Sequence, residues 1–132
     1  MRDRRKKRIL LFSFTGDRDV TTLLRPLAST EWDAVLFVDN TIRTALAEDE
    51  SNWAVRTDKD ATAVQERLTR MTNSWQALGG QSKSTAHAFI EEALQSVREM
   101  GAVECLITGS LLFVGNCLKC LQDKSIRIDR ED

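Results

Sequence analysis

Two short segments of this chain contain residue types that bind small anions. Residues 15–19 read TGDRD and residues 108–110 read TGS. Each segment follows an apolar run and precedes a stretch with helical spacing, so each would present backbone N–H groups at a helix N-terminus, where negative charge is favoured. Arg18 adds a planar fork of donors that suits a carboxylate or a phosphate. The two segments therefore indicate a site for a small anionic ligand.

The same residues also have an ordinary structural explanation. Asp17 or Asp19 would cap the helix that follows, and Arg18 would pair with a nearby carboxylate. Ser110 would cap the last helix in the same way. The residue types alone leave both explanations open.

Apolar runs and amphipathic stretches alternate along the chain and must position these two segments. Strands are predicted at residues 9–14, 34–38 and 103–108, and helices at 20–27, 61–78, 86–100 and 111–121. Pro26 should shorten or kink the first helix, and Leu111, Val114, Leu118 and Leu121 mark the predicted apolar face of the last one. This alternation predicts a three-layer α/β sandwich around a short, mostly parallel sheet with right-handed crossovers.

The predicted sheet explains why the two anion-binding segments belong together. Ligands of an open parallel sheet bind at the carboxyl ends of its strands, and both segments leave such an end. Three strands make a narrow sheet, so we expect that one edge lacks a strand that a longer chain would supply. The boundaries expected are a basic segment at residues 1–8, the domain at 9–122 and a charged tail at 123–132.

Composition excludes several classes of function. The chain has 132 residues, which suits one domain, and a net charge of −1, which makes no electrostatic case for nucleic acid. No apolar run has the length of a membrane span. Cys105, Cys117 and Cys120 lie in apolar stretches, which favours reduced thiols in a cytosol-like compartment. We predict no metal site, because a zinc centre needs four ligands and the cysteines and His87 lack finger spacing.

Four blocks of the sequence resemble, in order, blocks of the eukaryotic folylpolyglutamate synthases. Residues 10–19, LLFSFTGDRD, look like that family's L-L-F-N-x-T-G-D-R-D, and WDAVLF at residues 32–37 follows at its spacing. DESNWAV at residues 49–55 is similar to its D-x-x-N-F-T-V, and ITGSLLFVG at 107–115 to its V-T-G-S-L-H-L-V-G-G. The resemblance covers about residues 9–121.

The resemblance implies a fold, an activity and ligands. The family belongs to the Mur ligase superfamily, whose C-terminal domain is Rossmann-like. Its enzymes use ATP and Mg²⁺ to activate the γ-carboxylate of a reduced folate as an acyl phosphate, which the amine of glutamate attacks. The chain would be the C-terminal, glutamate- and nucleotide-handling domain only, with an N-terminal ATPase domain as its partner. The implied location is cytoplasmic, mitochondrial or both.

Site residues follow from the same resemblance. Arg18 matches the arginine of G-D-R-D, which is implicated in the glutamate and nucleotide site, and Ser110 matches a serine near the amino-acid site. Asp17, Asp19 and Gly109 would position these loops or the ligand.

The sequence also departs from the family. It lacks the P-loop G-x-x-G-K-G-S, the central metal-binding domain and the D-G-A-H segment, and Leu112 stands where histidine is common. No complete catalytic set is therefore expected in this chain. A non-catalytic binding or interaction module and an unrelated small nucleotide-binding domain remain the alternatives.

Overall fold

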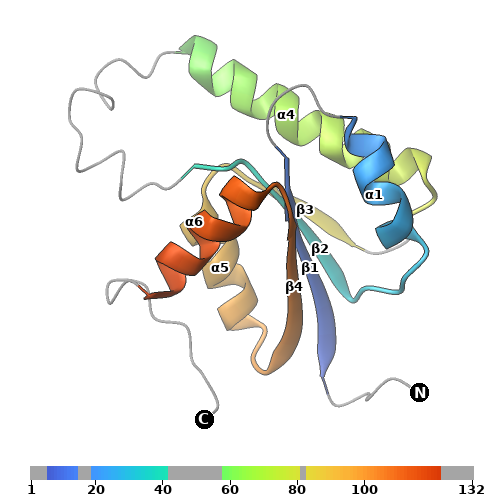
Figure 1. The fold of residues 1–132 in the computed structure, drawn as a ribbon, viewed down its shortest axis with the longest axis vertical. Coiled ribbons are helices and arrows are strands. Elements are labelled where there is room, and N and C mark those ends of the chain that lie inside the picture. The colour runs from blue at the N-terminus through green and yellow to red at the C-terminus, as the bar shows by residue number, and fades with distance from the viewer. Residues whose placement is uncertain (1–5, 15–18, 42–57, 81–82, 123–132) are drawn as a thin grey trace.

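The computed structural model describes residues 6–14, 19–41, 58–80 and 83–122, and the account below concerns these residues. They form a four-stranded, all-parallel sheet with helices on both faces (Figure 1). The prediction of an α/β fold with a parallel sheet is confirmed, and the layout is compatible with a Rossmann-like domain. In chain order the elements are β1 (Lys7–Ser13), α1 (Val20–Ala28), β2 (Ala34–Val38), α4 (Asp58–Ala77), β3 (Ser84–His87), α5 (Ile90–Glu99), β4 (Val103–Gly109) and α6 (Leu111–Gln122).

The two central strands, β1 and β2, are buried on both faces, as continuous apolar runs in a parallel sheet should be. Side chains alternate along each strand, so the two faces receive different residues. Leu10, Phe12, Val35 and Phe37 point toward α1 and α4. Ile9, Leu11, Leu36 and Val38 point toward α5 and α6.

The layer of α1 and α4 packs through aromatic rings. α4 buries residues at helical spacing, namely Val64, Leu68, Met71 and Trp75. The Phe37 ring meets Phe12 and Trp75 edge to face, with centroid distances of 6.3 and 6.1 Å. Gly79, at φ +79°, follows the end of α4. Pro26 lies in the last turn of α1, which stays short.

The face of α6 that packs on the sheet differs from the predicted one, although Leu121 of the predicted set does pack against the core. Phe113, Cys117 and Cys120 are buried against the core, whereas Leu111 is 89% and Leu118 53% exposed. The prediction was wrong because α6 is apolar on more than one side, so helical spacing could not single out the packed side.

The prediction of three strands was also wrong, because residues 84–87 form β3 and not the start of a helix. β3 pairs with β2 at one edge of the sheet and contains only one aliphatic side chain, Ala86, so it carries no apolar run. α5 begins at Ile90, after Phe89 in an extended conformation without a side-chain cap.

Candidate functional site

The carboxyl edge of the sheet contains a point where the strand order reverses. The order is β3-β2-β1-β4, so the chain first builds outward from β1 on one side and then returns to place β4 on the other. The chain that leaves β1 enters α1, which packs on one face, and the chain that leaves β4 enters α6, which packs on the other. In open α/β sheets ligands bind in the crevice that this divergence creates.

Gly109 brings the ends of the two strands together. Its φ is +121°, and a Cβ at this position would lie 1.8 Å from the Ser13 carbonyl oxygen. The amide of Ser110 donates to that same oxygen at 3.1 Å. The close approach therefore needs glycine, and it fixes the N-terminus of α6 beside the end of β1.

Ser110 is the N-cap of α6. Its hydroxyl oxygen accepts from the Phe113 amide at 3.1 Å, and its carbonyl oxygen accepts from Val114. The residue is only 4% exposed. The structural explanation considered for Ser110 thus holds, while a role in ligand binding stays a prediction. The cap leaves other first-turn amides of α6 without an intrahelical acceptor, which is the arrangement that binds anions at helix N-termini.

A second polar group lies at this point without a partner. Ser13 is 1% exposed, and its hydroxyl makes no hydrogen bond within the described part of the chain. Ser13 is in register with Gly109 at the ends of β1 and β4, and strand alternation places it on the α5/α6 side of the sheet, with Ile9 and Leu11. A buried hydroxyl without a partner is uncommon, and a ligand oxygen at the N-terminus of α6 would supply one.

Asp19 begins α1 as its N-cap. Its carboxylate accepts from the amides of Thr21 and Thr22 and from the Thr22 hydroxyl, at 3.0, 3.4 and 2.8 Å. The hydroxyl of Thr22 is the main cause that lowers the pKa of Asp19. Asp19 therefore positions the helix that follows β1. Asp17 and Arg18 lie outside the described residues, so their roles stay predictions.

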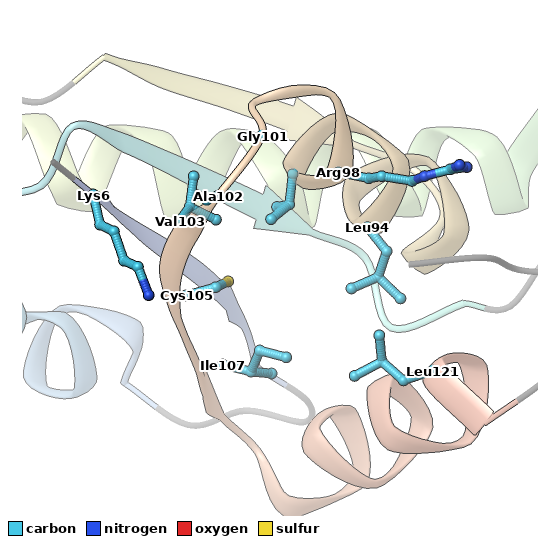
Figure 2. A pocket seen from close by; sticks show the side chains of 10 residues that line it. Lys6, Leu94, Arg98, Gly101, Ala102, Val103, Cys105, Ile107 and Leu121 are labelled. Carbon is cyan, nitrogen blue, oxygen red and sulfur yellow. The ribbon is translucent and has the colours of Figure 1, made fainter. Parts of the chain in front are cut away.

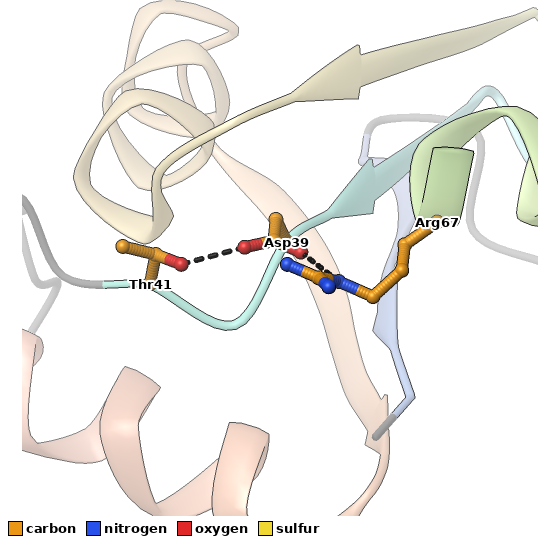
Figure 3. A network of polar contacts seen from close by, with 3 residues as sticks. All are labelled: Asp39, Thr41 and Arg67. Carbon is orange, nitrogen blue, oxygen red and sulfur yellow. Dashed lines mark hydrogen bonds and ion pairs between the residues drawn. The ribbon is translucent and has the colours of Figure 1, made fainter. Parts of the chain in front are cut away.

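The end of β2 carries a network that the sequence reading missed (Figure 3). The buried carboxylate of Asp39 contacts Arg67 Nε of α4 at 2.6 Å and accepts from the Thr41 hydroxyl at 2.6 Å. Next to it, the side-chain amide of Asn116 on α6 donates to Asn40 at 2.9 Å. An aspartate directly after an apolar strand was the available signal, but nothing in the sequence indicated Arg67 as its partner.

The described residues offer donors for an anion at the N-terminus of α6. They contain no group of three or more histidine, cysteine or carboxylate side chains that could hold a cation. Asp39, the one buried carboxylate among the described residues, is paired with Arg67. A phosphate or carboxylate fits the N-terminus of α6.

Comparisons with known proteins add no assignment. No protein-family model, curated protein or solved structure matches the chain. None of the helices in the described ranges combines the length and apolar character needed to cross a membrane.

Proposed function

We propose that the chain is the glutamate- and nucleotide-handling domain of a ligase of the folylpolyglutamate synthase type, and that it binds an anionic group at the carboxyl edge between β1 and β4. The observation that carries the proposal is the N-terminus of α6, held against the end of β1 beside the unpartnered Ser13 hydroxyl. This support is independent of the sequence resemblance, which selects the same segment through Gly109 and Ser110.

The anion would be a carboxylate of glutamate or a phosphate of the nucleotide. Amides at the start of α6 would bind its oxygens, and Ser13 would donate one further hydrogen bond. Arg18 is proposed as the charged partner, on the strength of the matching G-D-R-D block. The chain by itself is not proposed to catalyse the ligation, because the P-loop and the metal site supply most of the stabilisation in such a reaction.

The direct test is ligase activity with ATP, Mg²⁺, glutamate and a reduced folate. It is measured on this chain alone and on this chain mixed with a separately expressed N-terminal ATPase domain of the family. Activity only in the mixture supports the proposal, and Arg18→Ala should then abolish it while the domain stays folded. The ATPase domain joined to its own C-terminal domain is the positive control.

The alternative is a binding or interaction module without catalysis. It is favoured if the mixture is inactive while the control is active and the chain still binds glutamate or phosphate. Chemical shifts of the Gly109, Ser110 and Leu111 amides on titration with each anion report that binding. If these amides do not shift, the carboxyl edge is not the anion site, whether the chain is a ligase domain or a binding module.

A further inference from the structure

Arg67 of α4 is held at the carboxyl edge of the sheet by a buried carboxylate. Its Nε donates to one oxygen of Asp39 at 2.6 Å, and the other oxygen of Asp39 accepts from the Thr41 hydroxyl at 2.6 Å (Figure 3). Asp39 is 3% exposed, whereas the Arg67 side chain is 40% exposed. Burial of a carboxylate offsets much of what the ion pair contributes to stability. The pair does, however, hold the guanidinium in one place.

Most of the hydrogen-bond donors of Arg67 are not used by this pair. A guanidinium has five N–H donors in a planar fork, and the one on Nε is directed at Asp39. Within the described ranges, the terminal nitrogens bind no residue other than Asp39. Since the side chain is also partly exposed, these nitrogens can bind an oxygen anion that arrives from solution.

The strand pairing places this guanidinium near the anion site proposed above. Continuing the β1–β2 register past Phe12 and Phe37 sets Asp39 beside Phe14, just beyond the end of β1. Alternation along β2 puts Asp39 on the side that α1 and α4 cover, whereas α6 packs on the other side. Neighbouring strands are about 4.8 Å apart, so the ends of β2 and β4, with β1 between them, are about 10 Å apart. Donors therefore flank the end of β1 from both faces of the sheet.

A second guanidinium from α4 lies over the same strand end. The guanidinium carbon of Arg70 is 5.2 Å from the centre of the Phe14 ring, which is a cation–π distance. Phe14 is buried, so its ring is a fixed support for Arg70. Arg67 and Arg70 are three residues apart and therefore neighbours on the surface of α4. Two positive charges at one edge favour a ligand with more than one negative charge.

We propose that Arg67 binds a second anionic group of the ligand whose first anionic group lies at the N-terminus of α6, so that the site takes a molecule with two anionic groups. Asp39 acts through Arg67 as a positioning residue. The inference rests on the anion site of the proposed function and adds a class of ligand to it. A dicarboxylate such as glutamate and a polyphosphate such as that of a nucleotide both have this chemistry, and either is long enough to extend from one group of donors toward the other.

Lys6 provides a matched control at the opposite end of β1. It borders a cavity of about 580 Å³ that β4, α5 and α6 line mainly with apolar side chains (Figure 2). Lys6 directly precedes β1, so it lies about 23 Å along the strand from Ser13. Lys6→Gln therefore removes one positive charge far from the carboxyl edge.

Titrations of the full chain with two matched pairs of small molecules test the proposal. The pairs are phosphate with pyrophosphate and glutamine with glutamate, and the amide shifts at the start of α6 report binding. In at least one pair the molecule with the additional anionic group should bind about tenfold more tightly. The pair that shows this gain tells a polyphosphate ligand from a dicarboxylate. Most of the gain should be lost in Arg67→Gln and kept in Lys6→Gln.

A double variant separates binding from folding. Arg67→Gln leaves a buried carboxylate unpaired, which is strongly destabilising. Asp39→Asn combined with Arg67→Gln removes both charges and leaves the net charge of the chain unchanged. Circular dichroism confirms that the double variant folds. It should lose the gain as Arg67→Gln does, while phosphate still shifts the amides of α6.

Three outcomes contradict the proposal. A gain in neither pair, or a gain that the double variant keeps, overturns the role of Arg67 and leaves anion binding at α6 intact. An equal loss in Lys6→Gln also overturns it, because the gain would then come from overall charge. If none of the four molecules shifts the amides of α6, the anion site itself fails and this inference fails with it.

Discussion

β1 and β4 are hydrogen-bonded neighbours along their whole length, yet they lie in different environments. Leu10 and Leu106 are register partners on the same face of the sheet, but Leu10 is fully buried and Leu106 is 43% exposed. The difference arises because α1 and α4 cover β1 on this face, whereas β4 lies at the edge. Both segments read as apolar strands, so burial here depends on the position of a strand in the sheet and not on its composition.

The largest expected effect is the difference in stability between alanine variants of these two leucines. Leu10→Ala should lower the free energy of unfolding by about 2–5 kcal/mol, because it leaves a cavity in the core. Leu106→Ala should cost less than about 1 kcal/mol, because a large part of the side chain is already in water. Urea denaturation measures both. Similar losses in the two variants would show that β4 is covered in solution.

The next largest effect on stability is expected at Gly109, where the end of β4 contacts the end of β1. Gly109→Ala should destabilise the fold by about 2–4 kcal/mol, since the backbone is in a region that L residues avoid and the Cβ meets the Ser13 carbonyl oxygen. Gly115→Ala in α6 meets open space and should stabilise by about 0.5–1 kcal/mol. Thermal and urea unfolding of the two variants should therefore differ in sign.

The two buried serines at these strand ends should also differ in their effect on stability. Ser110→Ala removes the cap of α6 and should cost about 1 kcal/mol. Ser13→Ala removes a hydroxyl without a partner and should be neutral or stabilise the ligand-free chain by up to about 1 kcal/mol. If Ser13 donates to a bound anion, the same variant should bind phosphate or glutamate more weakly in a titration. Destabilisation by Ser13→Ala would mean that its hydroxyl already has a partner.

The smallest expected effect is a difference in pH dependence between the two helix N-caps, Asp19 after β1 and Ser110 after β4. The pKa of Asp19 is lowered, mainly by the Thr22 hydroxyl, so the ionised form stabilises the folded state. That contribution is fully present above the unfolded-state pKa and is lost as pH falls through the folded-state value. Asp19→Asn should therefore lower Tm slightly at neutral pH, and the difference should shrink as pH falls below about 4 and vanish once Asp19 is protonated in the folded state. The difference caused by Ser110→Ala should not change with pH, because a serine hydroxyl does not titrate in this range.

The central part of the fold could be predicted from the sequence because its signals are strong. Residues 34–38 and the apolar run from Ile9 were predicted as strands, and both form strands that are buried on both faces. β3 was missed because an edge strand with the sequence STAH has neither an apolar run nor a clear alternation. Apart from Leu121, the packed side of α6 was also missed, since the exposed Leu111 and Leu118 are as apolar as the buried residues.

The candidate site could be predicted only where it is local in sequence. Gly109 and Ser110 follow a strand and precede a helix, so their place at the carboxyl edge was predictable. Ser13 and Arg67 were not singled out. The lack of a partner for Ser13 and the pairing of Arg67 with Asp39 depend on contacts between segments distant in the chain.

The pairing of β1 with β4 also has a consequence for the order of folding. β2 follows β1 after one helix, but β4 is the last of the described strands to be synthesised, about 90 residues after β1. During synthesis from the N-terminus, β1 can pair with β2 early. The other edge of β1 has no partner strand until Val103–Gly109 has been synthesised. Closing such a long connection is slow, and until it closes β1, whose residues 9–12 are apolar and buried in the finished fold, has an open edge. β4, the least covered strand of the finished fold apart from its polar counterpart β3, is therefore the one whose arrival protects β1 from aggregation.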